Sequence, residues 1–367
     1  MNVFQKIYNR IYPKRFHTYY NKIKNNINLD KELNYITDTF INSESYQSVS
    51  NHWHILNINH YQNLLKFGLN KLGTKVFNRY YNFFDYKSEY LPNLFKDIKS
   101  DEMLSFNSNV FKTNSDLTLK EICNYNYLLL LIYFNLKKTN YFSYLNQLND
   151  DTYLNFGQPF ITIDNHNITS DKIISLFDLE NIEKFSLIKN NKILEIGAGS
   201  GRLSECILTI RNISNYTICD IPPAIFISYK RLKKAFPSKK IELLIDIKDE
   251  NELFNRINSN YISFIFPHQI KKVRKKLFDL TIAVDCLHEM NKSTLEFYFK
   301  NISNISHKLY FSIWKETKNW DSQTLFKRTE RLYFEKGDYP IPLKWKLDFK
   351  KNLKFPSNYI SLGYNLD

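Results

Sequence analysis

Three glycines at alternate positions follow a short apolar run in the second half of the chain. Residues 192–205 read KILEIGAGSGRLSE, so Gly197, Gly199 and Gly201 come directly after the run Ile193–Ile196. Glycine adopts backbone conformations that other residues avoid, and its missing side chain lets a ligand approach the main chain closely. An apolar strand, a glycine turn and a helix start therefore predict a loop that binds a small molecule.

The charges around this loop indicate a ligand without phosphates. A dinucleotide-binding loop has the spacing GxGxxG, and here its third glycine position holds Arg202. Glu195 stands two residues before the first glycine, where its negative charge would repel a pyrophosphate. The same carboxylate suits a ligand that carries an ammonium and a sulfonium group. These residues, with Ala198 inside the loop, predict a site for S-adenosylmethionine.

A second acid follows the next apolar run. Asp220 ends the segment NYTICD, 23 residues after Gly197. In open α/β sheets an acid at this point binds the hydroxyls of a ribose, so we expect Asp220 and its neighbour Ile221 to contact the cofactor. Alternatively, Asp220 does no more than cap the helix that Pro222 and Pro223 begin.

The segment DCLHEM at 285–290 holds candidates for proton transfer. It follows an apolar run and should lie at the carboxyl edge of the sheet, where ligands bind. We expect His288 to be the base that accepts a proton from an acceptor hydroxyl, because imidazole accepts protons near neutral pH. Glu289 could orient it, bind the acceptor or act as the base itself, and Asp285 is a third candidate. Alternatively, the segment only starts a helix, with Asp285 as its cap.

The elements that must position these residues follow from the apolar pattern. Residues 1–155 are mostly helical in pattern, whereas residues 156–367 alternate short apolar runs with helical segments. This predicts a helical N-terminal domain and a doubly wound α/β domain with helices on both faces of the sheet. The expected strands are Ile193–Ile196, Tyr216–Cys219, Ile241–Ile245, Ile262–Phe266, Leu280–Val284 and Leu309–Trp314, with two more in the tail. Which of the runs at 241–245 and 262–266 is third in the sheet stays open.

Composition sets limits on partners and location. The formal net charge is +14 over 367 residues. Two basic runs, at 229–240 and 271–276, could attract an anionic substrate or membrane surface, or could be solvated faces. Four cysteines without a CxxC pair, and no apolar run long enough for a signal or a membrane span, predict a cytoplasmic protein, with peripheral contact at the inner membrane face as an option. No metal site is expected, and the HWH segment at 52–54 is expected to start a helix or to pack in the core.

Four blocks in this order resemble the sugar O-methyltransferase family, a bacterial branch of the class I S-adenosylmethionine-dependent methyltransferases. They are ILEIGAGSGR, DIPPA, FIFPHQ and FDLTIAVDCLHEM, and they span residues 193–290. The resemblance implies a Rossmann-like, seven-stranded sheet behind the helical N-terminal domain. It also implies methyl transfer to a sugar hydroxyl in surface-glycan synthesis, with a sugar, nucleotide sugar or glycan as acceptor.

The remaining candidate residues flank these blocks. We expect His268 and Gln269, which end the block FIFPHQ, to lie near the cofactor. Arg202 could reach an anionic group of the substrate or form a surface ion pair. Gln158 resembles part of a substrate-side segment of the family.

Three other functions compete with this interpretation. The positive charge favours a nucleic-acid methyltransferase, but the chain has no NPPY-type block and no recognisable RNA-binding module. An oxidoreductase is disfavoured by Glu195 and Arg202. A non-catalytic partner in a glycan-assembly complex would not need the intact glycine loop, and a methyltransferase for another small molecule is also compatible with it.

Overall fold

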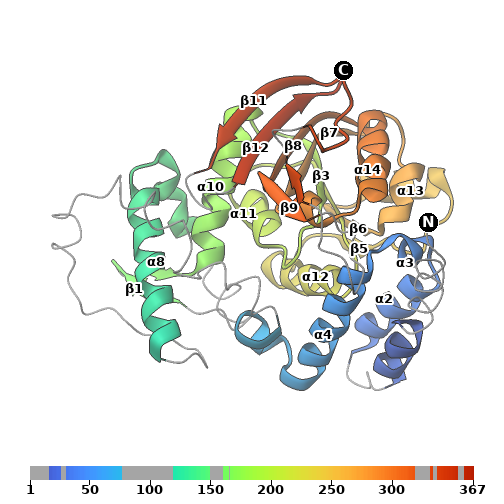
Figure 1. The fold of residues 1–367 in the computed structure, drawn as a ribbon, viewed down its shortest axis with the longest axis horizontal. Helices are drawn as coiled ribbons and strands as arrows, with labels where there is room; N and C mark the ends of the chain where they lie inside the picture. Colours follow the sequence, from blue (N-terminus) through green and yellow to red (C-terminus); the bar gives the residue numbers. More distant parts are fainter. Residues whose placement is uncertain are drawn as a thin grey trace.

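A mixed eight-stranded sheet forms the centre of the molecule (Figure 1). The structure is a computed structural model, and it describes residues 16–25, 30–76, 119–148, 160–164, 166–318, 331–333, 337–353 and 359–367. The strand order is β11-β12-β8-β7-β3-β4-β6-β5. The strands are β3 (Lys192–Ile196), β4 (Asn215–Cys219), β5 (Ile241–Leu243), β6 (Ile262–Ile265), β7 (Phe278–Val284), β8 (Ser306–Trp314), β11 (Lys346–Asn352) and β12 (Tyr359–Asn365).

The winding of the sheet changes direction at β3. This strand pairs in parallel with β4 on one side and with β7 on the other. The C-terminal hairpin of β11 and β12 is antiparallel, and β12 pairs with β8. Crevices at such a reversal, outside the carboxyl ends of the strands, are where open α/β sheets bind ligands.

The predicted α/β fold is confirmed, and the sheet has the eight strands of the apolar pattern, one more than the seven that the resemblance implies. β6 pairs with β4 and therefore takes the third position, whereas β5 pairs only with β6 and adds an outer strand. The apolar pattern found both runs, but it could not rank them, because an apolar run does not show which strand it pairs with. The two expected tail strands are β11 and β12.

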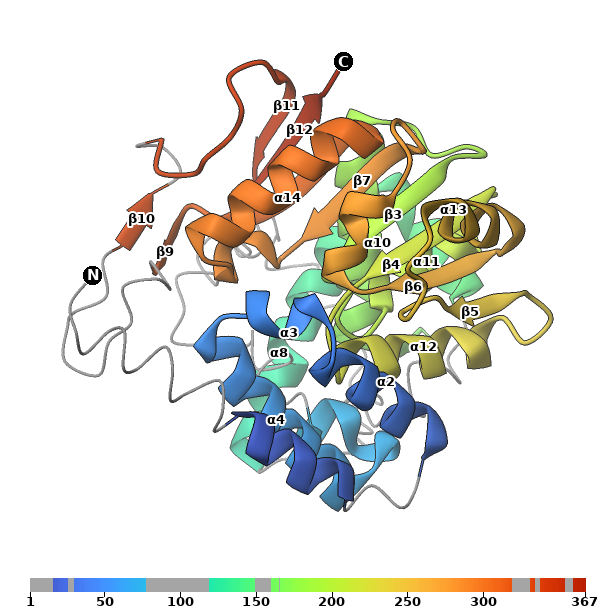
Figure 2. The same ribbon diagram turned by 90° about the vertical axis from the view of Figure 1, so that its right-hand side faces the viewer.

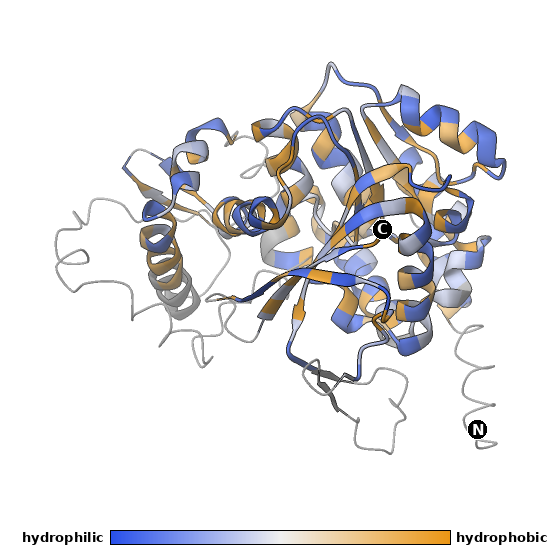
Figure 3. Ribbon diagram, turned by 90° about the horizontal axis from the view of Figure 1, so that it is seen from above, coloured by the Kyte–Doolittle hydropathy of each residue, from blue (hydrophilic) through white to orange (hydrophobic). Residues whose placement is uncertain are grey.

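Helices cover both faces of the sheet, as the continuous apolar strands predicted (Figure 2). On one face lie α10 (Ser170–Phe185), α11 (Arg202–Ile210) and α12 (Ala224–Ala235), whose buried side chains join one core cluster. On the other lie α13 (Glu250–Ser259) and α14 (Lys292–Ile305), with a second cluster. Figure 3 shows apolar residues on the strands and on the inward parts of the helices.

The N-terminal region is helical over its described parts, as expected. It holds a helix at 16–25, α2 (Lys31–Ile41), α3 (Glu44–Ser48), α4 (Asn51–Phe67), η1 (Leu69–Lys71), η2 (Leu72–Val76), α8 (Leu119–Lys137) and η4 (Asn140–Gln147). Two small hairpins complete the fold, β1 (Ile161–Ile163) with β2 (His166–Ile168) and β9 (Glu316–Lys318) with β10 (Arg331–Tyr333). The expected domain boundary at 155/156 lies outside the described residues. None of the helices in the described ranges is long and apolar enough to cross a membrane.

Two cations of the basic run at 229–240 form ion pairs within the protein. Lys230 forms ion pairs with Asp30 and Glu32, which join α12 to the start of α2. Arg231 is buried, and its guanidinium contacts Asp171 Oδ2 at 3.0 Å and Glu205 Oε2 at 2.6 Å. At least these two cations of the run are therefore used inside the protein.

The run at 271–276 is also partly engaged. Lys271 pairs with Glu44 on α3, and Lys276 pairs with Asp367 at the C-terminus. The guanidinium of Arg274 lies 3.7 Å from the ring centroid of Phe254. The sequence alone did not decide whether the charges of this run form a solvated face or bind an anion. Three of them form contacts within the protein instead.

Candidate functional site

The glycine loop connects β3 to α11 with three residues in the left-handed region. The φ angles are 70° at Gly197, 58° at Gly199 and 75° at Gly201. A Cβ at Gly197 would lie 2.6 Å from Cys286 Cβ, and one at Gly201 would lie 3.0 Å from Ser228 Cβ. A Cβ at Gly199 would meet no described atom within 4 Å, because this glycine faces a pocket. Gly197 and Gly201 are therefore required for close packing, and Gly199 leaves the pocket accessible to a ligand.

Asp220 lies at the end of β4 and is bonded to this loop. The Gly199 amide donates to Asp220 Oδ2 at 2.9 Å, and the Ile221 amide donates to Oδ1 at 2.7 Å. Burial raises the pKa of Asp220 to about 7. The cap of α12 is Pro223, without a side-chain hydrogen bond. The alternative role of Asp220 as a helix cap is therefore not realised.

Glu195 points away from the pocket, contrary to its expected contact with a cofactor. Its carboxylate accepts hydrogen bonds from Ser204 Oγ and, at 2.8 Å, from Tyr216 Oη. Burial raises its pKa. Side chains alternate along a strand, and Glu195 shares the α11 side with Ile193. We therefore assign Glu195 a structural role beneath α11.

The turn after β7 faces the glycine loop. Asp285 has a φ of 58°, unusual for a residue with a side chain. Tyr359 Oη on β12 donates a hydrogen bond to Asp285 Oδ1, and Cys286 Sγ donates to Ile196 O at 3.2 Å. Burial raises the pKa of Asp285 to about 7. The strained turn thus aims a fixed carboxyl group into the pocket.

His288 does not line the pocket, which corrects its expected role as the base. Its ring stacks on Trp314 with 4.4 Å between centroids and is buried. Its Nε2 lies 3.6 Å from Asp285 Oδ1, behind that carboxyl group. Burial lowers the pKa of His288 to about 3, so the ring is neutral near pH 7. The tight turn η6 (Leu287–Glu289) sends successive side chains in different directions, and His288 points inward.

Glu289 takes the position expected of His288. It lines the pocket from the last residue of η6. Burial, with a smaller contribution from the charge of Asp285, raises its pKa to about 8. A carboxyl group with a pKa near the working pH suits proton transfer.

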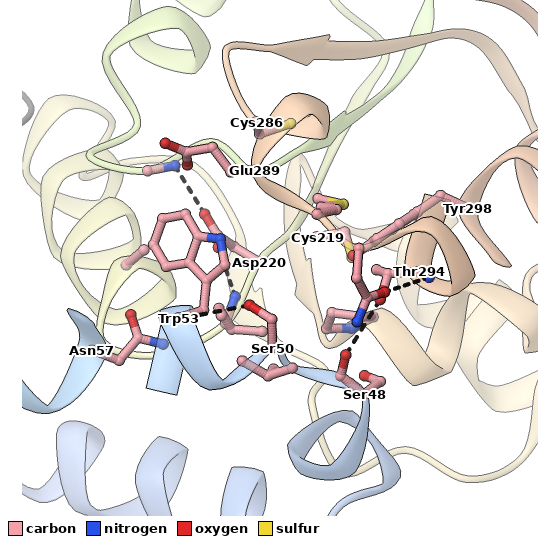
Figure 4. A pocket seen from close by; sticks show the side chains of 18 of the residues that line it. Ser48, Ser50, Trp53, Asn57, Cys219, Asp220, Cys286, Glu289, Thr294 and Tyr298 are labelled. Atoms are coloured by element: carbon pink, nitrogen blue, oxygen red, sulfur yellow. Dashed lines mark hydrogen bonds between the residues drawn. The ribbon is translucent and has the colours of Figure 1, made fainter. Parts of the chain in front are cut away.

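The pocket encloses about 340 Å³ between the sheet edge and the N-terminal helices (Figure 4). This volume falls in the range of small-molecule sites. Three elements supply most of the wall, namely the strand ends, the first turns of α14 and the helix α4. The residues that line it are Ser48, Val49, Ser50, Trp53, Asn57, His60, Gly197, Gly199, Cys219, Asp220, Ile221, Ala224, Pro267, Asp285, Cys286, Glu289, Met290, Asn291, Ser293, Thr294, Phe297 and Tyr298.

Helix α4 contributes a wall that sequence reasoning missed. Trp53, Asn57 and His60 are spaced i, i+4 and i+7 and line the pocket from one face of the helix. The HWH segment was expected to start a helix or to pack in the core. Helix α4 begins at Asn51, and the ring of His54 packs in the core, stacked on Phe16 with 4.8 Å between centroids. The polar positions at helical spacing were the available signal.

His268 and Gln269 also lie outside the pocket wall, to which their turn contributes Pro267. The side-chain Nε2 of Gln269 donates to Leu244 O at 2.7 Å and to Ile247 O at 3.0 Å. The backbone N–H of His268 donates to Ser45 Oγ at 3.0 Å. Gln269 holds the turn after β6, and His268 joins it to α3, so we assign both structural roles.

Arg202 forms an ion pair, but in a largely buried place. Its Nη1 lies 2.7 Å from Asp178 Oδ2 and 3.1 Å from Ser175 Oγ on α10. It does not line the pocket. Gln158 and the first helical segment at 4–11 lie outside the described residues.

The described ranges contain no group of three or more His, Cys, Asp or Glu side chains that could hold a metal ion. Cys206, Cys219 and Cys286 are free thiols, and burial raises the pKa of each. Cys286 is therefore held as the thiol rather than the thiolate.

Comparisons with known proteins find similarity only among solved structures. No protein-family model and no curated protein matches the chain. The PH0226 protein of Pyrococcus horikoshii OT3 is 15% identical over 53% of this chain and 89% of its own, with a TM-score of 0.37. A SAM-dependent methyltransferase from Aquifex aeolicus is 11% identical over 52% and 89%, with a TM-score of 0.33. The pyocyanin biosynthetic protein PhzM is 10% identical over 62% of each chain, with a TM-score of 0.36.

Proposed function

We propose that the chain is an S-adenosylmethionine-dependent methyltransferase that methylates a sugar hydroxyl. One observation is the main support for this cofactor. The glycine loop and Asp220 are hydrogen-bonded to each other at the carboxyl ends of adjacent strands, and both open on one pocket. This is the place where α/β sheets bind nucleotides.

The residues present fit that cofactor. Gly197 and Gly199 leave the loop backbone open to the pocket, and Asp220 retains lone pairs that can accept from ribose hydroxyls. In the described part of the chain, no Lys or Arg side chain lines the pocket, so nothing there would neutralise a pyrophosphate. A cofactor without phosphates and with a positive charge is therefore favoured over a dinucleotide.

Glu289 is the residue we assign as general base, with Asp285 beside it. S-adenosylmethionine supplies an electrophilic methyl group when bound. Glu289 accepts the proton of the acceptor hydroxyl, and its raised pKa makes it a stronger base than an exposed carboxylate. Asp285, held by Tyr359, keeps a second carboxyl group at the same place.

The sugar acceptor rests on the resemblance of four sequence blocks, and so does a place in surface-glycan synthesis. A cytoplasmic location belongs to the same proposal. The main rival, a nucleic-acid methyltransferase, drew its support from the net charge. That support is reduced, because cations of both basic runs form internal ion pairs.

A thermal-shift comparison tests this function. Ligands that bind only the native state raise the melting temperature. S-adenosylhomocysteine should raise it in proportion to the logarithm of its concentration, whereas NAD should leave it unchanged. Stabilisation by NAD alone would move the chain to the oxidoreductases, and stabilisation by neither would favour a non-catalytic partner.

A further inference from the structure

One face of α4 has no role in cofactor binding as proposed above, yet it lines the same pocket. Trp53, Asn57 and His60 follow one another along this face at successive turns. In Figure 4, Trp53 and Asn57 extend from α4 on the side of the pocket where Glu289 lies. The residue assigned as base therefore shares its part of the pocket with α4.

Asn57 is the most informative of the three residues. Its side chain is almost completely buried, lines the pocket and faces the hydroxyl of Tyr20 with its amide nitrogen. A side-chain amide carries two N–H donors, and the Tyr20 hydroxyl can pair with one of them, so the other can meet a ligand. Asn57 thus offers a donor to a molecule in the pocket.

The charges of the wall restrict what that molecule can be. Asp220, Asp285 and Glu289 bring three carboxyl groups to the pocket, and the described wall has no Lys or Arg. A phosphate in this space would meet repulsion without a compensating cation. An uncharged ring with several hydroxyls would meet an indole, an amide, an imidazole and a carboxylate instead.

We propose that Trp53, Asn57 and His60 form, with Glu289, the acceptor subsite, and that it takes an uncharged sugar ring. The inference rests on the proposed function and narrows it. The part of the acceptor that enters the pocket carries no phosphate, which disfavours a nucleotide sugar whose pyrophosphate adjoins the methylated ring.

A glycan library with methyl-tritiated S-adenosylmethionine tests the subsite. The library contains neutral glycosides, sugar phosphates, nucleotide sugars and acidic glycans. Asn57→Leu removes the amide at similar volume, and Asn59→Leu makes the same change on the exposed side of α4. Calorimetry with S-adenosylhomocysteine is run on each variant, so that loss of cofactor binding is recognised separately.

The expected result is label in uncharged glycans only. Asn57→Leu should reduce transfer by about tenfold or more, the loss of one hydrogen bond to a ligand, while the Kd for S-adenosylhomocysteine stays within about twofold. Asn59→Leu should match the wild type. Three outcomes would overturn the subsite: label confined to phosphorylated or acidic members, transfer unaffected by Asn57→Leu, or no label in the library from a protein that binds S-adenosylhomocysteine. Absence of that binding in the wild type would instead defeat the proposed function.

Discussion

The backbone amide of Gly199 donates a 2.9 Å hydrogen bond to Asp220 Oδ2 and so ties the loop after β3 to the end of β4. The other carboxylate oxygen accepts from the Ile221 amide. Both oxygens are fixed by main-chain donors, and each keeps a lone pair for a ligand. The site is therefore held in place by backbone geometry before any ligand arrives.

Replacing the proposed base should abolish most transfer without unfolding the protein. We expect Glu289→Gln to lower kcat by about 10²–10⁴, the usual contribution of a general base. The wild-type rate should rise with pH, reach half of its maximum near pH 8, the pKa of Glu289, and level off once Glu289 is fully ionised. Glu296→Gln, on the exposed side of α14, is the control and should keep the wild-type rate and profile. A Glu289→Gln enzyme with wild-type kcat would exclude this base.

The buried carboxyl groups of the pocket should make stability fall as pH rises. Burial raises the pKa of Asp220 and Asp285 to about 7 and that of Glu289 to about 8, above their values in the unfolded chain. Folding therefore favours their protonated forms, and this contribution is lost as pH rises from about 4 through 8. Urea unfolding between pH 6 and 8.5 should show a falling free energy of unfolding, with a smaller fall in Glu289→Gln. An equal slope in both proteins would contradict the assignment.

Arg231 should be essential to the fold rather than to anion binding. Arg231→Met leaves Asp171 and Glu205 buried without their cation, which typically costs about 3–5 kcal/mol. The matched control, Lys233→Met, removes a half-exposed cation of the same helix and should change stability by less than about 1 kcal/mol. Chemical denaturation measures both, and similar small effects would place Arg231 outside the core.

The elements that could be predicted from the sequence were those with local sequence signals. The run Ile193–Ile196, the glycine turn and the helix start after it lie close together in the sequence, and the structure has the strand, the turn and the helix there. The orientation of single side chains was less accessible. His288 is one position away from the pocket-lining Glu289, and Glu195 lies on the α11 side of β3. Alternation along a strand or turn does not say which face the tertiary structure will open.

The α4 wall could be predicted only in part. Its helix is signalled by the sequence, and Trp53, Asn57 and His60 fall on one face of it. That this face meets the carboxyl edge of the sheet depends on long-range contacts, such as Ser45 with His268 and Lys230 with Asp30. Such contacts join residues far apart in the chain, and no local pattern encodes them.

The acidic wall should distinguish charged from neutral forms of the cofactor. Asp285 and Glu289 attract a positive charge in the pocket. The amine-bearing analogue sinefungin should therefore bind about tenfold more tightly than S-adenosylhomocysteine, a difference of about 1.4 kcal/mol. Asp285→Asn should bring the two Kd values closer together. The same ratio in wild type and variant would show that these carboxyl groups do not act on the bound ligand.

The central claim is that the glycine loop binds S-adenosylmethionine, and calorimetry with S-adenosylhomocysteine tests it most directly. Gly199→Arg fills the pocket at a glycine with φ 58°, and Gly337→Arg imposes similar backbone strain at φ 75°, outside the pocket wall. We predict that the wild type and Gly337→Arg bind with similar Kd and that Gly199→Arg binds at least about tenfold more weakly. Undiminished binding by a folded Gly199→Arg protein, or no binding by the wild type, would contradict the claim.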